Sequence, residues 1–312
     1  MKKIPVGHTI AQTYGFAFRK YLTLFGIVWF AALIMVLLAL LVFVPLMKNY
    51  FGMVQVLMTQ RGGPPVLPAG LGRTLGAILL ADIVILYLYL AVRVGIAKEL
   101  LGLRTGPRFI YVSFGSAELR ALGGYVLAFL IAYAAIIAVA VVLTLLAIVA
   151  GVAGGFHPQA GAAAGAVGGI VVLLVFAAEL VFLYALVRLT FFIVPVAVAE
   201  KELGIFESWR LTRGNFWRIF VVLLAVWIPL LIVEFAAFAA LMGGQMAAIF
   251  SQAMNGNHPP DMQAIMDVYL GALPWFLIGG FVLMPIVYGM IGAPSVFAYR
   301  SLKEEEAPQP AA

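Results

Sequence analysis

The sequence predicts an all-α membrane protein with six transmembrane helices. Of its 312 residues, 65% are hydrophobic and only 10% are charged, and the mean hydropathy is +1.12, values far outside the range of soluble globular domains. Six apolar runs reach the roughly 20 residues that a helix needs to cross a hydrocarbon core about 30 Å thick. None of these runs alternates apolar and polar residues as the strands of a membrane β-barrel do.

Polar connections separate the six predicted spans. The spans cover Leu22–Met47, Leu75–Ala97, Tyr125–Val149, Val167–Thr190, Ile219–Met242 and Tyr269–Tyr299. The first span follows Lys2 and Lys3 as a signal peptide would, but no small-residue cleavage site comes after it, so we expect it to be retained. The sixth span contains Pro274, Pro285 and Pro294, which we expect to kink or divide the helix.

Lysine and arginine gather on one side of the predicted membrane. That side carries fourteen of them: Lys2, Lys3, Arg19, Lys20, Lys98, Arg104, Arg108, Arg120, Lys201, Arg210, Arg213, Arg218, Arg300 and Lys303. The opposite side carries three, Lys48, Arg61 and Arg73. Because basic loops stay in the cytoplasm, we expect both termini to be cytoplasmic. The same bias accounts for the net charge of +6, which therefore indicates contact with an anionic leaflet and not with nucleic acid.

The second predicted cytoplasmic loop, Ala199 to Phe220, mixes aromatic and charged residues. Its aromatic residues include Phe206, Trp209, Phe216 and Trp217, and its charged residues include Glu207, Arg210, Arg213 and Arg218. A short helix there can place its aromatic side chains in the headgroup region and its arginines toward phosphates. The same residues also suit simple anchoring of the loop by an aromatic belt and a basic flank.

Two of the predicted cytoplasmic helix ends resemble each other. Tyr89-Leu-Ala-Val-Arg93 recurs as Tyr184-Ala-Leu-Val-Arg188, Lys-Glu-Leu follows each copy, and polar segments come next at Ser113–Leu122 and Phe206–Asn215. In the N-terminal segment, Ile10, Tyr14, Phe18 and Tyr21 have helical spacing. We therefore predict a threefold repeat of an interfacial helix followed by two spans. The third copy has Tyr288 but carries Gly292 in place of the arginine.

The region around the end of the fourth span resembles a known family. Arg188, the segment Ile193-Val-Pro-Val-Ala-Val-Ala-Glu200 and the segment Glu207-Ser-Trp-Arg-Leu-Thr-Arg-Gly-Asn-Phe-Trp-Arg218 are similar to the hallmark of the glycerophosphoryl diester phosphodiesterase membrane-domain family and its YciC-type inner-membrane relatives. The resemblance implies a six-helix protein of the bacterial inner membrane, in a family that mostly lacks a defined activity. Some relatives carry a soluble phosphodiesterase domain, but only a short segment follows Ser301 here, so we expect no phosphodiesterase activity.

The same reasoning predicts a simple domain organisation. We expect residues 1–301 to form a single six-helix transmembrane domain. Residues 302–312 carry four charged residues in a row, Lys303 to Glu306, and end in proline and alanine, a composition that cannot form a packed core. We therefore expect them to form a disordered cytoplasmic tail.

Few ionisable residues interrupt the spans. Asp82, Glu179 and Glu234 lie in the second, fourth and fifth spans, and Arg93 and Arg188 lie toward the cytoplasmic ends of the second and fourth. A charge at mid-membrane costs roughly 2.5 to 3.5 kcal/mol on insertion scales, so each of these residues needs a partner. We predict that the three acids form an intramembrane polar cluster along a proton or substrate path. Interhelical pairing, with arginines that snorkel to the interface, is the alternative.

Enzyme chemistry has little support in the sequence. Cysteine is absent, and no zinc-protease, nucleophile-elbow or P-loop motif occurs. His258 lies near Asp261 and Asp267, but a loop histidine beside proline is typical of a turn. Ser113, Ser116 and Ser208 are interpreted as helix caps or turn hydroxyls. We therefore expect no catalytic residue, metal site or cofactor.

The arginines favour a function in lipid handling. Arg93, Arg188, Arg210 and Arg213 lie near the predicted cytoplasmic headgroups, where they can meet a phosphate. We therefore predict a non-enzymatic protein that binds or moves a lipid-like anionic amphiphile at the cytoplasmic leaflet. The alternative is a scaffold or assembly factor for another membrane protein, or a homo-oligomer, with Gly161, Gly165 and Gly169 as a helix-packing face. An intramembrane enzyme that uses one of the three acids is a third hypothesis.

Overall fold

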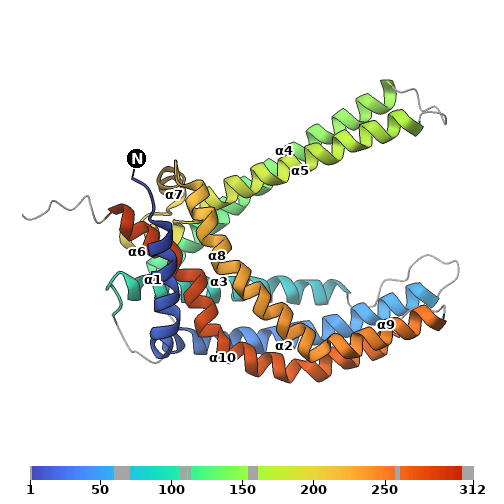
Figure 1. The fold of residues 1–312 in the computed structure, drawn as a ribbon, viewed down its shortest axis with the longest axis horizontal. Helices are drawn as coiled ribbons and strands as arrows, with labels where there is room; N and C mark the ends of the chain where they lie inside the picture. The colour runs from blue at the N-terminus through green and yellow to red at the C-terminus, as the bar shows by residue number, and fades with distance from the viewer. Residues whose placement is uncertain are drawn as a thin grey trace, which may run out of the picture. The chain divides into compact units, whose positions relative to one another are not determined.

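The computed structural model describes residues 2–59, 71–105, 111, 114–153, 161–256 and 261–303. Every regular element in these ranges is a helix (Figure 1). The elements are α1 (Val6–Arg19), α2 (Tyr21–Thr59), α3 (Leu71–Leu100), α4 (Ser116–Ala153), α5 (Gly161–Thr190), α6 (Ile193–Ala199), α7 (Ile205–Leu211), α8 (Phe216–Phe238), the π-helical turn η1 (Ala239–Gly243), α9 (Gly244–Gly256) and α10 (Met262–Lys303).

Six helical stretches within the described ranges are long and apolar enough to cross a membrane. They are Tyr21–Met47, Leu75–Leu100, Ser116–Val142, Val172–Ala199, Phe216–Gly256 and Met262–Lys303. Each overlaps one of the spans that the sequence predicts, because a run of about 20 apolar residues determines a span by its own length and composition. The predicted fold class, an all-α protein with six transmembrane helices, is confirmed.

Prolines inside the long helices do not divide them. The sixth predicted span lies within one helix, α10, of 42 residues. A proline lacks an N–H, so the carbonyl four residues before it loses its helical donor. In α8, Pro229 leaves the Ala225 carbonyl without a helical donor. The hydroxyl of Tyr14 donates a hydrogen bond to that carbonyl oxygen at 2.7 Å instead. A side chain from α1 thereby satisfies the freed carbonyl, and α8 continues past its proline.

Contacts divide the chain into two compact units. Unit 1 comprises Met1–Pro5, Gly115–Phe220 and Ala298–Ala312, and unit 2 comprises Val6–Phe114 and Val221–Phe297. In unit 1, α4 and α5 lie side by side, and α6 and α7 pack near the start of α4 and the end of α5 (Figure 1). The single domain expected from the sequence stays a prediction. The first two residues of the expected tail, Leu302 and Lys303, belong to α10, and residues 304–312 lie outside the described residues.

The core of unit 2 lies between α2, α3 and α10. Leu24, Ile27, Val28, Ala31, Ala32 and Met35 of α2 pack with Leu88, Val92 and Ile96 of α3, and Phe281, Met284 and Tyr288 of α10 pack against them. Gly292 faces this core, since a Cβ atom there would lie 3.2 Å from Cδ1 of Ile96. An arginine at position 292 would displace the apolar side chains of α3, which is a packing reason for its absence from the third copy of the Tyr–Arg motif.

Helix α1 packs against the rest of unit 2 through a face that carries threonine and alanine. The buried residues of α1 are Thr9, Thr13 and Ala17, whereas Phe18 is exposed. A Cβ atom at Gly289 of α10 would lie 3.3 Å from Cα of Ala17. At Ala17, therefore, α1 and α10 approach too closely for a larger side chain.

Two copies of the predicted repeat share a local geometry, although the threefold repeat itself stays a prediction. The guanidinium carbon of Arg93 lies 5.6 Å from the centre of the Tyr89 ring, and that of Arg188 lies 5.5 Å from the centre of the Tyr184 ring. The segments before the third and fifth spans differ, however. Helix α4 runs without a break from Ser116 into the third span, whereas α7 is separated from α8 by a turn.

Candidate functional site

Arg188 is the centre of a buried polar network in unit 1. It lies in the last turn of α5, and only 8% of the residue is exposed. Its Nε donates to Oγ1 of Thr212 at 3.2 Å, its Nη1 donates to the Tyr184 hydroxyl at 3.0 Å, and its Nη2 donates to the Trp209 carbonyl at 2.8 Å. The guanidinium carbon also lies 3.8 Å from the centre of the Trp209 ring. The network therefore joins the end of α5 to α7 and the turn after it.

The partners of Arg188 are neutral. Within the described part of the chain, no carboxylate lies within the 4.0 Å that defines an ion pair. Hydrogen bonds from a charged donor to neutral acceptors and contacts with aromatic faces both stabilise a desolvated guanidinium. Because the three hydrogen bonds point in different directions, they also hold the planar guanidinium in one orientation.

Ser208 and Thr212 complete this network. The Ser208 hydroxyl donates to the Arg188 carbonyl at 2.8 Å and accepts from the Phe192 N–H at 3.1 Å. The Thr212 hydroxyl donates to the Trp209 carbonyl at 3.0 Å. Ser208 was expected to cap a helix or to lie in a turn, but it lies inside α7 and bridges α7 to the junction of α5 and α6. The bridging role depends on the tertiary packing of α7 and has no local sequence signal.

The opposite face of α7 is exposed. Ile205, Ser208 and Thr212 are buried, whereas Phe206 is 80% exposed and Trp217, at the start of α8, is 73% exposed. The side chain of Arg210 is 70% exposed, and Trp209 and Arg213 are also exposed. We call Phe206, Trp209, Arg210, Arg213 and Trp217 the aromatic–basic surface. The short helix predicted for this loop is therefore present, with aromatic and basic side chains displayed together.

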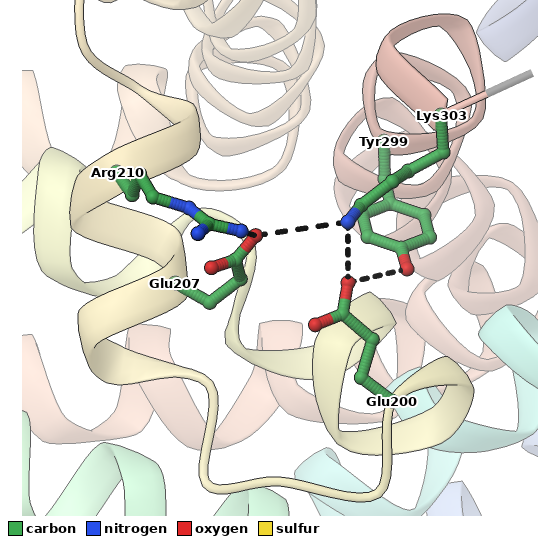
Figure 2. Close-up of polar contacts among 5 residues, drawn as sticks. All are labelled: Glu200, Glu207, Arg210, Tyr299 and Lys303. Carbon is green, nitrogen blue, oxygen red and sulfur yellow. Dashed lines mark hydrogen bonds and ion pairs between the residues drawn. The ribbon is translucent and has the colours of Figure 1, made fainter. Parts of the chain in front are cut away.

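A second polar cluster of unit 1 joins α6, α7 and the end of α10 (Figure 2). Lys303 Nζ lies 3.1 Å from Oε1 of Glu200 and 3.8 Å from Oε1 of Glu207. The Tyr299 hydroxyl donates to Oε1 of Glu200 at 2.8 Å, and Arg210 Nη2 donates to Oε1 of Glu207 at 2.7 Å. Two acids and two bases balance one another here, so the cluster binds the end of α10 to the loop without adding net charge.

Replacing Lys303 with glutamine is expected to lower the free energy of unfolding by less than about 1 kcal/mol, because partly exposed ion pairs are weak. The difference from the native chain should vanish at high salt, which screens such pairs. Denaturation in mild detergent at low and high salt measures both effects, with Arg19→Gln as the control for loss of one exposed charge. A salt-independent loss of more than about 2 kcal/mol would contradict this view.

The N-terminal residues of unit 1 are held by side chains that sequence patterns do not reveal. Asn215 Oδ1 accepts from the Ile4 N–H at 3.0 Å, and its Nδ2 donates to the Lys2 carbonyl at 3.0 Å. Arg218 Nη1 donates to the Ile4 carbonyl at 2.8 Å. Asn215 is buried. Because Asn215 and Ile4 are 211 residues apart, no local spacing connects them.

The other predicted arginine of the spans lies in unit 2. Arg93 is half-buried near the end of α3, with its guanidinium beside the Tyr89 ring. Its predicted contact with a headgroup stays a prediction, as do those of Arg188, Arg210 and Arg213.

The three predicted acids are exposed and not buried. Asp82 and Glu234 belong to unit 2 and Glu179 belongs to unit 1, and each side chain lies on the surface of its span. Within the described residues, none of the three makes a hydrogen bond or an ion pair. The burial expected of them is therefore not observed, and the intramembrane cluster that they were predicted to form stays a prediction.

Asp261 has a structural role at the start of α10. Its Oδ1 accepts from the N–H groups of Gln263 and Ala264 at 2.9 and 3.4 Å, which is the geometry of an N-cap. His157 and His258 lie outside the described residues. Among the residues that the structure does describe, no group of three or more His, Cys, Asp or Glu side chains is placed to hold a metal ion.

Comparisons with protein-family models, with curated proteins and with solved structures found no match. The resemblance carried by Arg188 and the two segments that follow it stays an expectation.

Proposed function

We propose that this protein binds or moves a lipid-like anionic amphiphile at the cytoplasmic leaflet of a bacterial inner membrane, without catalysing a reaction, and that both of its termini are cytoplasmic. The proposal is supported by one observation above all, the aromatic–basic surface of α7 and the residues that follow it. Exposed tryptophan and phenylalanine favour the headgroup region, and exposed arginine favours phosphate.

In this proposal the arginines divide into two roles. Arg210 and Arg213 contact the headgroup, because their side chains are exposed; Arg210 pairs with Glu207 through Nη2, and 70% of its side chain still remains exposed. Arg188 is a positioning residue, because its guanidinium is engaged with Thr212, Tyr184 and Trp209. It holds α7 in the orientation that turns the aromatic–basic surface outward.

The double variant Arg210→Gln/Arg213→Gln tests this proposal. Native mass spectrometry of the gently purified protein, followed by identification of the molecules that co-purify, should show an anionic amphiphile on the native chain. We expect the double variant to retain at least about tenfold less of this amphiphile than the native chain does. Each charge-assisted hydrogen bond to phosphate contributes on the order of 1.5 kcal/mol or more.

The matched control is Arg19→Gln/Lys20→Gln, which removes the same charge from exposed residues outside α7. Equal losses in the two double variants would mean that the overall positive charge, and not the aromatic–basic surface, attracts the lipid. An amphiphile that is absent from the native chain, or retained in full by the α7 variant, would overturn the proposal.

A scaffold or assembly factor is the second candidate, and the exposed acids favour it. Glu179 lies on the surface of a span among the exposed side chains of Phe176, Leu180 and Val181. A carboxylate facing acyl chains costs roughly 2.5 to 3.5 kcal/mol, which a basic group on a neighbouring protein would offset. In the same mass spectra, a stoichiometric protein partner in place of a lipid would favour this candidate.

A further inference from the structure

Unit 2 contains an apolar cavity of about 200 Å³ between α2, the junction of α8 with η1, and α10. The residues that line it are Val44, Met47, Phe238, Met242, Met266, Tyr269, Leu270, Leu273 and Phe276. Nearly all of the lining is hydrocarbon, aromatic ring or thioether, and Tyr269 supplies its single hydroxyl. A water molecule needs two to four polar partners, so such a cavity favours an apolar occupant over water.

The cavity lies at the end of the spans that is remote from the basic loops. Val44 and Met47 are 24 and 27 residues beyond Lys20, a distance of about 36 to 40 Å along α2 at 1.5 Å per residue. A hydrocarbon core is about 30 Å thick, and lysine at a helix end lies at the headgroup level. This path is longer than the core is thick, so the cavity lies at the headgroup boundary opposite Lys20, at the far end of the span.

The chain departs from regular α-helix beside this cavity. Residues Ala239–Gly243 form a π-helical turn, and the lining residues Phe238 and Met242 lie immediately before it and within it. π-helical turns appear frequently at functional sites because they widen the helix and redirect its side chains. Met242 is buried, and with Met47 and Met266 it gives the cavity three flexible, polarisable side chains that adapt to irregular occupants.

Size and chemistry then select the occupant. A helix with its side chains is about 10 to 12 Å across, too thick to enter a cavity of this volume, whereas an apolar cavity of ~150 Å³ already admits a molecule as large as benzene. The flexible apolar molecules at the outer membrane boundary are the acyl chains of lipids. We infer that this cavity is a binding site for a segment of the acyl chain of an outer-leaflet lipid. This site uses no residue of the aromatic–basic surface.

Photolabelling tests the site. The full chain is reconstituted in phosphatidylethanolamine–phosphatidylglycerol vesicles that contain a phospholipid with a diazirine in its acyl chain, irradiated, digested and mapped by mass spectrometry. We expect label on the peptides that contain Met47, Met242 and Met266. Filling the cavity with Leu273→Trp should reduce that label about tenfold, since losing the burial of about two methylene groups changes affinity by that factor.

The control is Ile278→Trp, which adds the same side chain at an exposed position of α10 outside the cavity and should leave the label unchanged. A milder filling variant, Leu270→Phe, is labelled in parallel in case Leu273→Trp does not yield monodisperse protein. Absence of label from the cavity peptides of the native chain overturns the inference, and so does equal labelling of native and filled chains or a cross-linked protein in the cavity. None of these outcomes depends on Arg210 or Arg213, so acyl-chain binding in the cavity and headgroup binding at the aromatic–basic surface succeed or fail separately. Only the assignment of the cavity to the outer leaflet rests on the proposed cytoplasmic termini.

Discussion

Replacing Arg188 with alanine is expected to detach α7 from the end of α5 and to destabilise unit 1 by about 3 kcal/mol or more. Three charge-assisted hydrogen bonds and a cation–π contact over Trp209 are lost together, and such interactions contribute roughly 1.5 to 3 kcal/mol each when they are not exposed to water. Lysine should not restore the network, because an ammonium cannot donate in three fixed directions as a guanidinium does.

Thiol labelling distinguishes detachment of α7 from a general loss of stability. The chain has no cysteine, so Ile205→Cys introduces a single thiol at a buried position of α7, and Phe206→Cys introduces one at an exposed position. With Arg188 present, a maleimide should react slowly at residue 205 and quickly at residue 206. With Arg188→Ala or Arg188→Lys, residue 205 should react nearly as fast as residue 206.

The matched control for this prediction is Arg210→Ala on the exposed face of α7. Arg210 pairs with Glu207, but its side chain is largely exposed. The free energy of unfolding should therefore change by no more than about 0.5 to 1 kcal/mol. If the thiol at residue 205 remained protected in both Arg188 variants, Arg188 would not be the residue that positions α7.

Replacing Gly124 with alanine is expected to destabilise unit 1 by about 1 to 3 kcal/mol, the usual cost of overpacking. A Cβ atom at residue 124 of α4 would collide with the Leu203 carbonyl oxygen and would lie 2.9 Å from Cγ2 of Ile193. The first of these atoms belongs to the backbone and cannot rotate away. The segment before α7 is also fixed by Gly204, whose φ of +80° favours glycine, so α4 itself must move.

The control for Gly124 is Gly271→Ala in α10, where a Cβ atom would meet nothing within 4 Å. Alanine is a better helix former than glycine by roughly 0.8 to 1 kcal/mol, so this change should stabilise the protein slightly. Thermal unfolding in detergent, followed by size-exclusion chromatography, measures both variants. A Gly124→Ala variant at least as stable as the native chain would mean that the close approach of α4 to Leu203 does not limit the residue at position 124.

The membrane class and the six spans could be predicted because they depend on local properties. A run such as the one from Leu75 onward determines a span by its own length and hydropathy, whatever packs against it. Prolines were a poorer guide, since Pro229 depends on Tyr14 of α1 to satisfy the carbonyl that it frees. The close approach of α10 to Ala17 of α1 at Gly289 also has no local sequence signal, because it depends on how two helices far apart in sequence pack.

In the candidate site, too, local composition could be read from the sequence and packing could not. The sequence marked the aromatic and basic residues of the second loop and predicted a short helix, because their composition suits a membrane interface on its own. It did not separate Arg188, which is buried against Thr212, Tyr184 and Trp209, from Arg210, whose side chain is largely exposed. Both are arginines near a predicted interface, and only packing decides which of them is accessible.

By itself the sequence determined that this chain is a helical multi-pass membrane protein. The free energy of transferring a helix into the bilayer is the sum over its own residues, so each span can be recognised without knowing what packs against it. Only the tertiary structure decided which polar groups meet and which spaces stay open. Asn215 reaches Ile4 across 211 residues, and α2, which is far from α8 and α10 in sequence, lines the apolar cavity together with them. Hydrogen bonds and cavities are properties of side chains brought together from different helices, and the hydropathy of each helix does not contain that information.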